Sequence, residues 1–255
     1  MKYVRFSAAG NTSYGIVDGD SIQELRGNIF EKAVPTGKTL PLAGVQLLAP
    51  CEPANVVAVG QNYKSHLGDR PQRPYPGLFW KPKSCITDPG VEIVFPEGAS
   101  NVHYEAELVL VIGKTARNVA REDVPQYIFG ITAGNDVSER DWQKNDLQWF
   151  RAKGSDTFGP VGPAIVTGLD YNNLLVESRL NGEVRQSQRT TDLLFDIATI
   201  VNYVTQFVTL QPGDIIFTGT PGQTKAMAPG DIIEVEVEGV GVLRNRIAEA
   251  RAAAR

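Results

Sequence analysis

Short apolar runs separated by turn-forming residues dominate this chain and leave little room for long helices. Short runs of apolar or alternating residues are typical of strands. Such runs occupy Tyr3–Phe6, Tyr14–Val17, Ser21–Glu24, Val56–Val59, Val91–Phe95, His103–Ile112, Val176–Leu180, Glu183–Arg185, Ile215–Phe217 and Ile232–Glu238. Only residues 193–208 carry apolar side chains at helical spacing over a long stretch. Without a βαβ rhythm, this pattern predicts a mainly β fold with short helices, a roll or sandwich rather than a Rossmann fold or TIM barrel.

The chain divides into three parts by composition. Residues 1–48 are predicted to form a small β-rich N-terminal domain, and residues 49–249 a larger domain. The stretch from Pro35 to Pro50 is rich in turn-forming residues, and we expect it to be a connector. The Ala/Arg tail at 250–255 is expected to be a frayed helix end.

Composition and charge exclude several classes of protein. The 25 Lys and Arg residues against 29 Asp and Glu residues give a net charge of −4, which argues against nucleic-acid and membrane binding. The chain has no apolar run long enough to cross a bilayer, no signal-peptide core at its N-terminus and no phosphate-binding glycine motif. Cys51 and Cys85 show neither metal-type nor disulfide-type spacing, so we expect a cytoplasmic protein.

Glu105 and Glu107 occupy alternate positions at the start of an expected strand, so their side chains are predicted to share one face. The apolar run that follows places both carboxylates near the interior, where their repulsion requires a cation, a proton or basic partners. A hard divalent cation bound through oxygen atoms is the simplest solution. A second set of acids alternates with apolar residues along one expected strand. These acids are explained as the solvent-exposed face of that strand, whose opposite face is apolar and packs on the core. The set consists of Glu234, Glu236 and Glu238.

Asp136 is a third candidate ligand, because it ends a glycine-containing apolar run at 129–135 that we expect to be a buried strand. The residues Ser138–Asp141 have the spacing of a capping box that would open a short helix. On that helix Arg140 and Gln143 are three residues apart and share a face. Either residue could equally be an ordinary surface group.

The chain contains two histidines, His66 and His103. His66 lies in a segment bounded by glycines and prolines, which we interpret as a mobile lid. Asp69, three residues later, would meet it on a helical turn and raise its basicity. The alternative for His66 is an exposed surface position. His103 precedes Glu105 on the same strand face, and we expect a packed core histidine rather than a group that supports the acids.

Six short motifs follow one another along the chain. They are Gly60-x-Asn62-Tyr63-x-x-His66, Phe79-x-Lys81-Pro82, His103-Tyr104-Glu105-Ala106-Glu107, Gly134-Asn135-Asp136-Val137-x-x-Arg140-Asp141-x-Gln143, Lys153-x-x-Asp156-Thr157-x-Gly159-Pro160 and Gly213-Asp214-Ile215-Ile216-Phe217-Thr218-Gly219-Thr220-Pro221. Each motif is short, but their joint order and spacing are specific. Together they resemble the fumarylacetoacetate hydrolase family from about residue 45 to 247, and the N-terminal unit resembles the small domain found ahead of many bacterial members.

This resemblance implies a mixed β-sandwich roll that forms a homodimer. It also implies Mg²⁺ or Mn²⁺, with Ca²⁺ as a further candidate, held by Glu105, Glu107 and Asp136. The catalytic set that it implies, with His66 as the base, is His66, Asp69, Lys153, Arg140 and Gln143. The substrate-binding set that we expect is Thr220, Tyr63 and Lys81.

The resemblance implies an enzyme that acts on small 2-oxo acids or dicarboxylates. The leading hypothesis is hydrolysis of a C–C bond in an acylpyruvate-like substrate through a metal-stabilised enolate. An isomerase of 2-hydroxyhepta-2,4-diene-1,7-dioate or an oxaloacetate decarboxylase would share that intermediate, and a noncatalytic metal- or metabolite-binding relative is the alternative from another class. Two positions depart from the family's pattern. Asp69 stands where hydrolytic relatives often carry glutamate, and Gly222-Gln223-Thr224-Lys225 replaces a glycine-rich continuation, so the substrate cannot be carried over.

Overall fold

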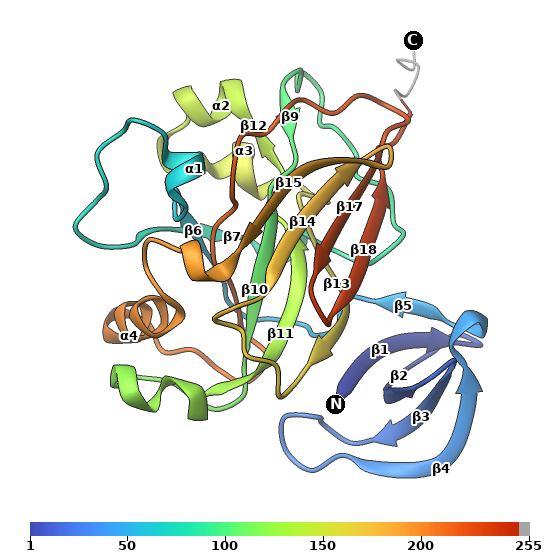
Figure 1. Ribbon diagram of the computed structural model, residues 1–255. Helices are drawn as coiled ribbons and strands as arrows, with labels where there is room; N and C mark the ends of the chain where they lie inside the picture. Colours follow the sequence, from blue (N-terminus) through green and yellow to red (C-terminus); the bar gives the residue numbers. More distant parts are fainter. Residues whose placement is uncertain (250–255) are drawn as a thin grey trace.

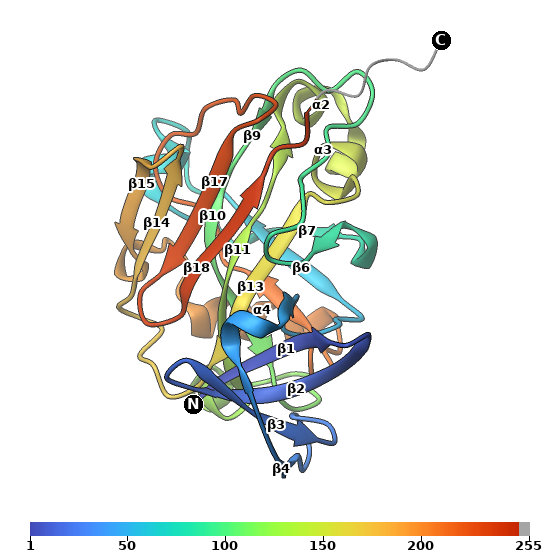
Figure 2. The same cartoon turned by 90° about the vertical axis from the view of Figure 1, so that its right-hand side faces the viewer.

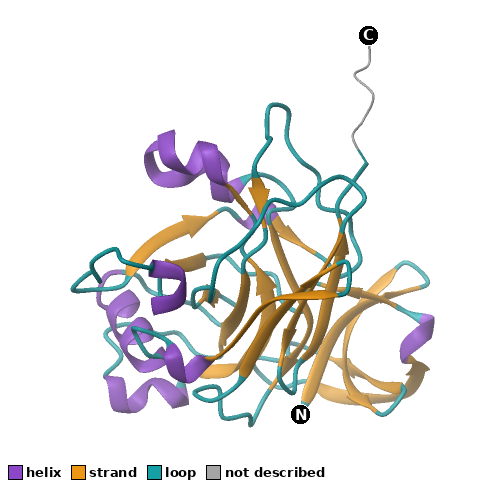
Figure 3. Ribbon diagram, turned by 45° about the horizontal axis from the view of Figure 1, so that its top comes forward, coloured by secondary structure: helices purple, strands orange, loops and turns teal. Residues whose placement is uncertain are grey.

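A computed structural model describes residues 1–249, and over these residues the chain is mostly strand with four short α-helices (Figure 1). The helices are α1 (Lys64–Leu67), α2 (Arg140–Asn145), α3 (Phe150–Gly154) and α4 (Ile197–Phe207). Single 3₁₀ segments are η1 (Leu42–Gly44), η2 (Lys83–Cys85), η3 (Arg121–Gln126), η4 (Leu147–Trp149) and η5 (Thr190–Asp192). Figure 3 shows how short these helical segments are beside the strands. The tail at 250–255, expected to be a frayed helix end, lies outside the described residues.

A large mixed sheet forms the centre of the molecule. Its main path runs β4 (Val34–Pro41), β3 (Ser21–Arg26), β2 (Asn11–Asp18), β1 (Lys2–Ala8), β13 (Gly159–Val166), β11 (Ile128–Asn135), β10 (Ala106–Ile112), β16 (Ile215–Phe217), β6 (Val56–Gly60) and β7 (Gly77–Lys81). In addition β5 (Gln46–Leu48) pairs with β1, and β8 (Ile86–Thr87) pairs with β13. The sheet is mixed because β16 is parallel to β6 and β8 is parallel to β13.

A second, antiparallel sheet packs against the first and closes the core (Figure 2). Its order is β15 (Glu183–Arg189), β14 (Leu175–Leu180), β17 (Ile232–Val237) and β18 (Gly241–Arg246). The hairpin of β14 and β15 turns at Asn181 and Gly182, both at positive φ, as the sequence predicts. Between the layers lie buried apolar residues of both sheets and of α4. The remaining strands, β9 (Val102–His103) and β12 (Ser138–Glu139), form a short pair.

The expected strand-rich fold is confirmed, and two of the expected segments differ. The stretch from Pro35 to Pro50 is not a connector, because it forms β4, η1 and β5. As the edge strand of the large sheet, β4 tolerates the proline that suggested a loop. The run Val91–Phe95 forms no strand and contributes one isolated bridge, at Ile93. Pro89 and Pro96 flank it, and proline cannot donate to a ladder.

Two helices begin at residues other than those expected. The periodic stretch at 193–208 becomes helical only at Ile197, because the Asp196 side chain accepts the Thr199 amide at 2.7 Å and caps it. The helix α2 is capped by Glu139, whose carboxylate accepts the Trp142 amide at 2.5 Å, and not by Ser138.

None of the helices in residues 1–249 is both long and apolar enough to span a lipid bilayer.

Candidate active site and metal centre

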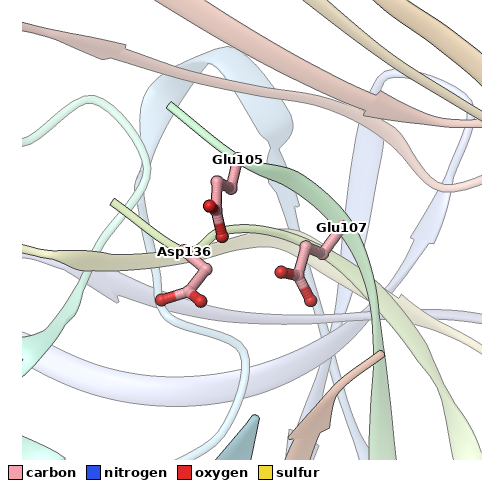
Figure 4. A group of neighbouring side chains, drawn as sticks. All are labelled: Glu105, Glu107 and Asp136. Atoms are coloured by element: carbon pink, nitrogen blue, oxygen red, sulfur yellow. The ribbon is translucent and has the colours of Figure 1, made fainter. Parts of the chain in front are cut away.

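Three carboxylates converge where β10 begins and β11 ends. The two strands are antiparallel, with Glu107 opposite Gly134, so Asp136 comes to lie directly beside Glu105. The Asp136 amide donates to the Glu105 carbonyl at 2.9 Å, and the Glu105 amide donates to the Asn135 side chain at 2.9 Å. One oxygen of each acid lies within 4.8 Å of the others, and all three acids are buried (Figure 4).

The strand that carries these acids is interrupted, contrary to expectation. The predicted run His103–Ile112 is split, because β9 ends at His103 and β10 starts at Ala106. Glu105 therefore lies in the break, held there by the Asn135 side chain. The two glutamates still point toward Asp136 (Figure 4).

Basic side chains surround two of the three carboxylates. Lys153 of α3 places its Nζ 2.7 Å from Glu105 and 2.6 Å from Asp136. Lys81, at the end of β7, lies 2.7 Å from the other oxygen of Asp136, and Arg140 of α2 lies 2.5 Å from Glu105. These contacts tie the short helices to the acids.

Glu107 is the carboxylate that this arrangement leaves without a basic partner. Within residues 1–249 it forms no ion pair, and its hydrogen-bond donor is the Gly219 amide at 2.6 Å. Burial raises the pKa of Glu107 well above its usual value, and the carboxylates of Asp136 and Glu105 add to the shift. For Glu105, burial alone would raise the pKa, but the charges of Lys153 and Arg140 hold it well below its usual value.

These residues fit a divalent cation. Their buried carboxylate oxygens are the hard donors that Mg²⁺ and Mn²⁺ prefer, and they gather within reach of one ion. A cation at this point would also favour the charged form of Glu107, which forms no ion pair within the described residues.

A cavity of about 510 Å³ opens beside the carboxylates, a volume typical of sites for small molecules. Its wall includes six of the residues that the sequence identified as candidates. They are His66, Glu105, Arg140, Gln143, Lys153 and Thr220. Arg140 donates to Gln143 at 2.8 Å, as their shared helix face predicts.

His66 is the titratable group that α1 brings to the acids. Its Nε2 lies 3.8 Å from Glu105 Oε1, and its Nδ1 lies 2.7 Å from the Gly222 carbonyl. A carbonyl can only accept, so Nδ1 carries the proton and Nε2 keeps a free lone pair. Burial lowers the pKa of His66 below 6.5, and Glu105 and the Gly222 carbonyl oppose this only in part. The imidazole is therefore neutral at pH 7 and able to accept a proton.

Asp69 is not brought to His66. The helical turn ends at Leu67, and the chain leaves it through a glycine with a φ of 65°, which carries Asp69 to an exposed position. Arg70 binds the end of this turn instead, donating to the carbonyls of His66 at 3.1 Å and Leu67 at 2.9 Å. The Gly222 carbonyl occupies the orienting position that a carboxylate was expected to fill.

The residues expected to bind substrate lie in different surroundings. Thr220 borders the cavity, and its hydroxyl donates to the Ala106 carbonyl at 2.8 Å. Lys81 is buried behind the acids, where it binds Asp136 and the carbonyls of Lys153 and Phe158. Tyr63 is also buried, and neither it nor Lys81 is part of the cavity wall.

His103 lies on the cavity wall, so the expectation of a packed core histidine is wrong. The break after β9 turns its ring toward Thr224, whose hydroxyl is 2.9 Å from Nδ1, while Asn101 accepts from Nε2 at 2.8 Å. Thr224 also accepts from Arg140 at 2.8 Å. Burial lowers the pKa of His103 to about 4, so the ring is neutral and the chain of hydrogen bonds fixes Arg140.

Sequence reasoning missed Gln186, a buried residue of β15. Its Nε2 donates to Thr220 at 2.7 Å, and its Oε1 accepts from the Ala106 amide at 3.1 Å and the Ser178 hydroxyl at 2.9 Å. Gln186 thus links the second sheet to Ala106, which lies between Glu105 and Glu107. A glutamine in a hairpin strand gives no signal of this, because the partners come from elsewhere in the chain.

The fold and the site together define a β roll that buries three acids beside a cavity of the size that small-molecule sites have. Residues 55–248 match the family described as fumarylacetoacetate (FAA) hydrolase C-terminal, and residues 1–50 match the family described as Rv2993c-like, N-terminal. The chain belongs to the fumarylacetoacetate hydrolase family, and the resemblance inferred from its motifs is confirmed.

Three similar proteins show the range of activities in this family. The crystal structure of 5-carboxymethyl-2-hydroxymuconate delta-isomerase from Mycobacterium smegmatis has 40% identity and a TM-score of 0.92, over 98% of this chain and 100% of that one. Maleylpyruvate hydrolase from Sphingobium sp. SYK-6, solved with manganese(II) and pyruvate, has 30% identity and a TM-score of 0.82, with coverage of 98% and 100%. Oxaloacetate tautomerase Fahd2a, mitochondrial, from Rattus norvegicus is 39% identical over 82% of this chain and 71% of its own. These relatives are enzymes of three kinds.

Proposed function

We propose that this chain is an enzyme that moves a proton at the carbon next to the 2-oxo group of a small 2-oxo acid or dicarboxylate, as a tautomerase or isomerase. The placement of His66 carries this proposal. Its Nε2 is free of a proton and lies 3.8 Å from Glu105 at the acidic centre, and Gly222 holds Nδ1. One neutral, oriented base is what proton transfer from an acidic C–H bond needs.

The residues around His66 would share the remaining tasks. Glu105, Glu107 and Asp136 would hold Mg²⁺ or Mn²⁺, and such a cation supplies Lewis-acid polarisation of the 2-oxo group when bound. Lys153, which lies 2.7 Å from Glu105, would place a positive charge beside the substrate oxygen on which negative charge develops. Arg140 has five N–H donors, of which residues 1–249 engage three, through Glu105, Gln143 and Thr224. The remaining donors could orient a substrate carboxylate.

Hydrolysis of an acylpyruvate-like C–C bond, the leading hypothesis from the sequence, becomes the second candidate. It requires a water molecule to be activated as well, and a carboxylate behind the imidazole would strengthen the base for that step. Asp69, the expected carboxylate, is exposed and does not reach His66. The likeness to a maleylpyruvate hydrolase favours this candidate. Oxaloacetate decarboxylation needs no added water and belongs on the same assay panel.

The test is an assay of the Mg²⁺-loaded chain and of His66→Gln with three substrates. They are the enol form of oxaloacetate, a 2-hydroxymuconate-type diacid and acetylpyruvate. We expect enol–keto conversion or isomerisation of a diacid, slowed about 100-fold or more by His66→Gln. Cleavage of acetylpyruvate without either conversion would overturn the proposal in favour of hydrolysis, and release of CO₂ from oxaloacetate without tautomerisation would overturn it in favour of decarboxylation. No turnover of any substrate would favour a binding protein.

We also propose that the chain assembles as a homodimer, as the family resemblance implies. Light scattering should then give a mass twice that of one chain, and the mass of a single chain would contradict this.

A further inference from the structure

We propose that Trp149, with Phe79 beside it, forms a specificity-determining wall that selects substrates with a flat, unsaturated carbon chain. The inference rests on the proposed function, because it takes the 2-oxo acid head of the substrate to lie at the carboxylates. Both rings border the cavity that His66 and Glu105 border.

The backbone before α3 is unusual and places Trp149 at the cavity. Gln148 has a φ of 64° and Trp149 a φ of 55°, so two consecutive residues that are not glycine adopt the left-handed conformation. L-residues disfavour this conformation, and such strain gathers at sites that bind ligands. The flanking apolar residues point outward, with Leu147 88% and Phe150 79% exposed. The strained turn therefore brings one aromatic ring inward at the cost of exposing its neighbours.

The contacts of the Trp149 ring tie it to the acidic centre. Its ring and that of Phe79 meet edge to face, with centroids 5.1 Å apart and planes at 73°. Phe79 also contacts Lys153, whose Nζ lies 5.1 Å from the ring centroid. A Cβ on Gly60 would lie 3.5 Å from the Trp149 ring, so the indole also covers the end of β6. One aromatic ring thus separates Trp149 from the lysine that binds Glu105 and Asp136.

The other residues of the cavity wall limit which substrates could place their carbon chain against these rings. This part of the wall is mostly polar, and it includes the basic side chains of Arg140 and Lys144 and the neutral imidazole of His103. A substrate that carries a second carboxylate and conjugated double bonds would satisfy both kinds of surface, because flat π systems pack well on aromatic rings and carboxylates bind basic groups. A saturated chain of the same length would lose only the aromatic contribution.

The test compares two inert diacids of six carbons, trans,trans-muconate and adipate, which differ in two double bonds. Isothermal titration of each into the Mg²⁺-loaded chain gives a ratio of dissociation constants. We expect muconate to bind more tightly, and Trp149→Leu to reduce the ratio about fivefold. Trp149→Phe should keep part of the preference. The matched control is Trp80→Leu, because Trp80 is 52% exposed, lies outside the cavity wall and should leave the ratio unchanged.

Several outcomes would overturn the proposal. An unchanged ratio in Trp149→Leu, an equal change in Trp80→Leu, or no measurable binding of muconate to the unaltered chain would each do so. Retained adipate binding shows that Trp149→Leu still folds, and if it does not fold, an unchanged ratio in Trp149→Phe overturns the proposal. Neither diacid has a 2-oxo group to react, so the ratio is independent of turnover. If no substrate of the panel is turned over but the ratio of dissociation constants still depends on Trp149, the proposed function is refuted and this subsite is not.

Discussion

His66 takes its orientation from the main chain. Beside its contact with the Gly222 carbonyl, Ser65 accepts the Gly222 amide at 2.9 Å, and Gln223 donates to the Ser65 carbonyl at 2.9 Å. These contacts hold α1 against residues 222–223, which belong to the segment that departs from the family's pattern. The segment that differs from the family's pattern, and so prevents the substrate from being inferred, therefore helps to position the base.

Replacement of Asp69 by asparagine should change kcat by less than about twofold, because the exposed carboxylate does not contact the imidazole. Replacement of His66 by glutamine should lower kcat about 100-fold or more, since it removes the base. Steady-state kinetics on whichever substrate the panel identifies compares the two variants. A loss in Asp69→Asn that matches the loss in His66→Gln would show that the carboxylate reaches the base during turnover.

The pH dependence of kcat/KM should follow His66. Because burial holds its pKa below 6.5, the neutral base persists from pH 7 down past pH 6.5, and activity should fall only as the pH drops through that lower pKa. Because the pKa of His66 is lower in the folded chain than in the unfolded chain, protonation favours unfolding. The free energy of unfolding should therefore be highest above pH 6.5 and should decrease as the pH falls below it. A pH–rate profile whose acid limb has its midpoint at or above 6.5 would contradict the assignment.

At the scale of elements, the close packing of β10, β11 and β16 sets the positions of the acids. A Cβ on Gly134 would lie 2.5 Å from Val109 and 2.6 Å from Phe217, so only glycine fits opposite Glu107. From the other side of the core, Gln186 of β15 binds Ala106, the residue between Glu105 and Glu107, and Thr220. The acid-bearing strand is thus fixed from both of its sides.

Gln186→Met should weaken Mn²⁺ binding about tenfold, because it removes the partner of the amide between Glu105 and Glu107. It should also lower the free energy of unfolding by about 1–3 kcal/mol, since buried polar groups lose their partners. Calorimetric titration of Mn²⁺ and thermal unfolding measure the two effects. The same substitution at the exposed Gln206 of α4 is the control. Lower stability with unchanged Mn²⁺ affinity would leave Gln186 a purely structural role.

Much of the fold follows from local patterns, and the site follows only in part. The alternation of Ile233, Val235 and Val237 with acids predicts β17 correctly, because one face of that strand packs on the core. Contacts between distant segments have no such signature. Neither the Gly222 carbonyl behind His66 nor Trp149 on the cavity wall could be predicted, since both depend on how loops fold back.

On the scale of the whole molecule, the cavity is lined by residues of the large sheet and of α1, α2 and α3. These three helices lie near one another in the upper part of Figure 1. The acids of the site lie in β10 and directly beside the ends of β10 and β11, its base comes from α1, and Lys153 comes from α3. Burying three carboxylates with incomplete compensation opposes folding, and a bound cation would offset that cost through linkage. We therefore expect metal binding to stabilise the fold.

The most direct test is calorimetric titration of Mn²⁺ into the unaltered chain, Glu107→Gln and Glu234→Gln. Of the three acids at the site, Glu107 is the one that forms no ion pair within residues 1–249. Glu234 lies on the outer face of β17, so Glu234→Gln makes the same chemical change away from the site and serves as the control. The account predicts one Mn²⁺ per chain, an affinity at least tenfold lower in Glu107→Gln, and no change in Glu234→Gln. No saturable binding, or equal affinity in Glu107→Gln and the unaltered chain, would contradict it.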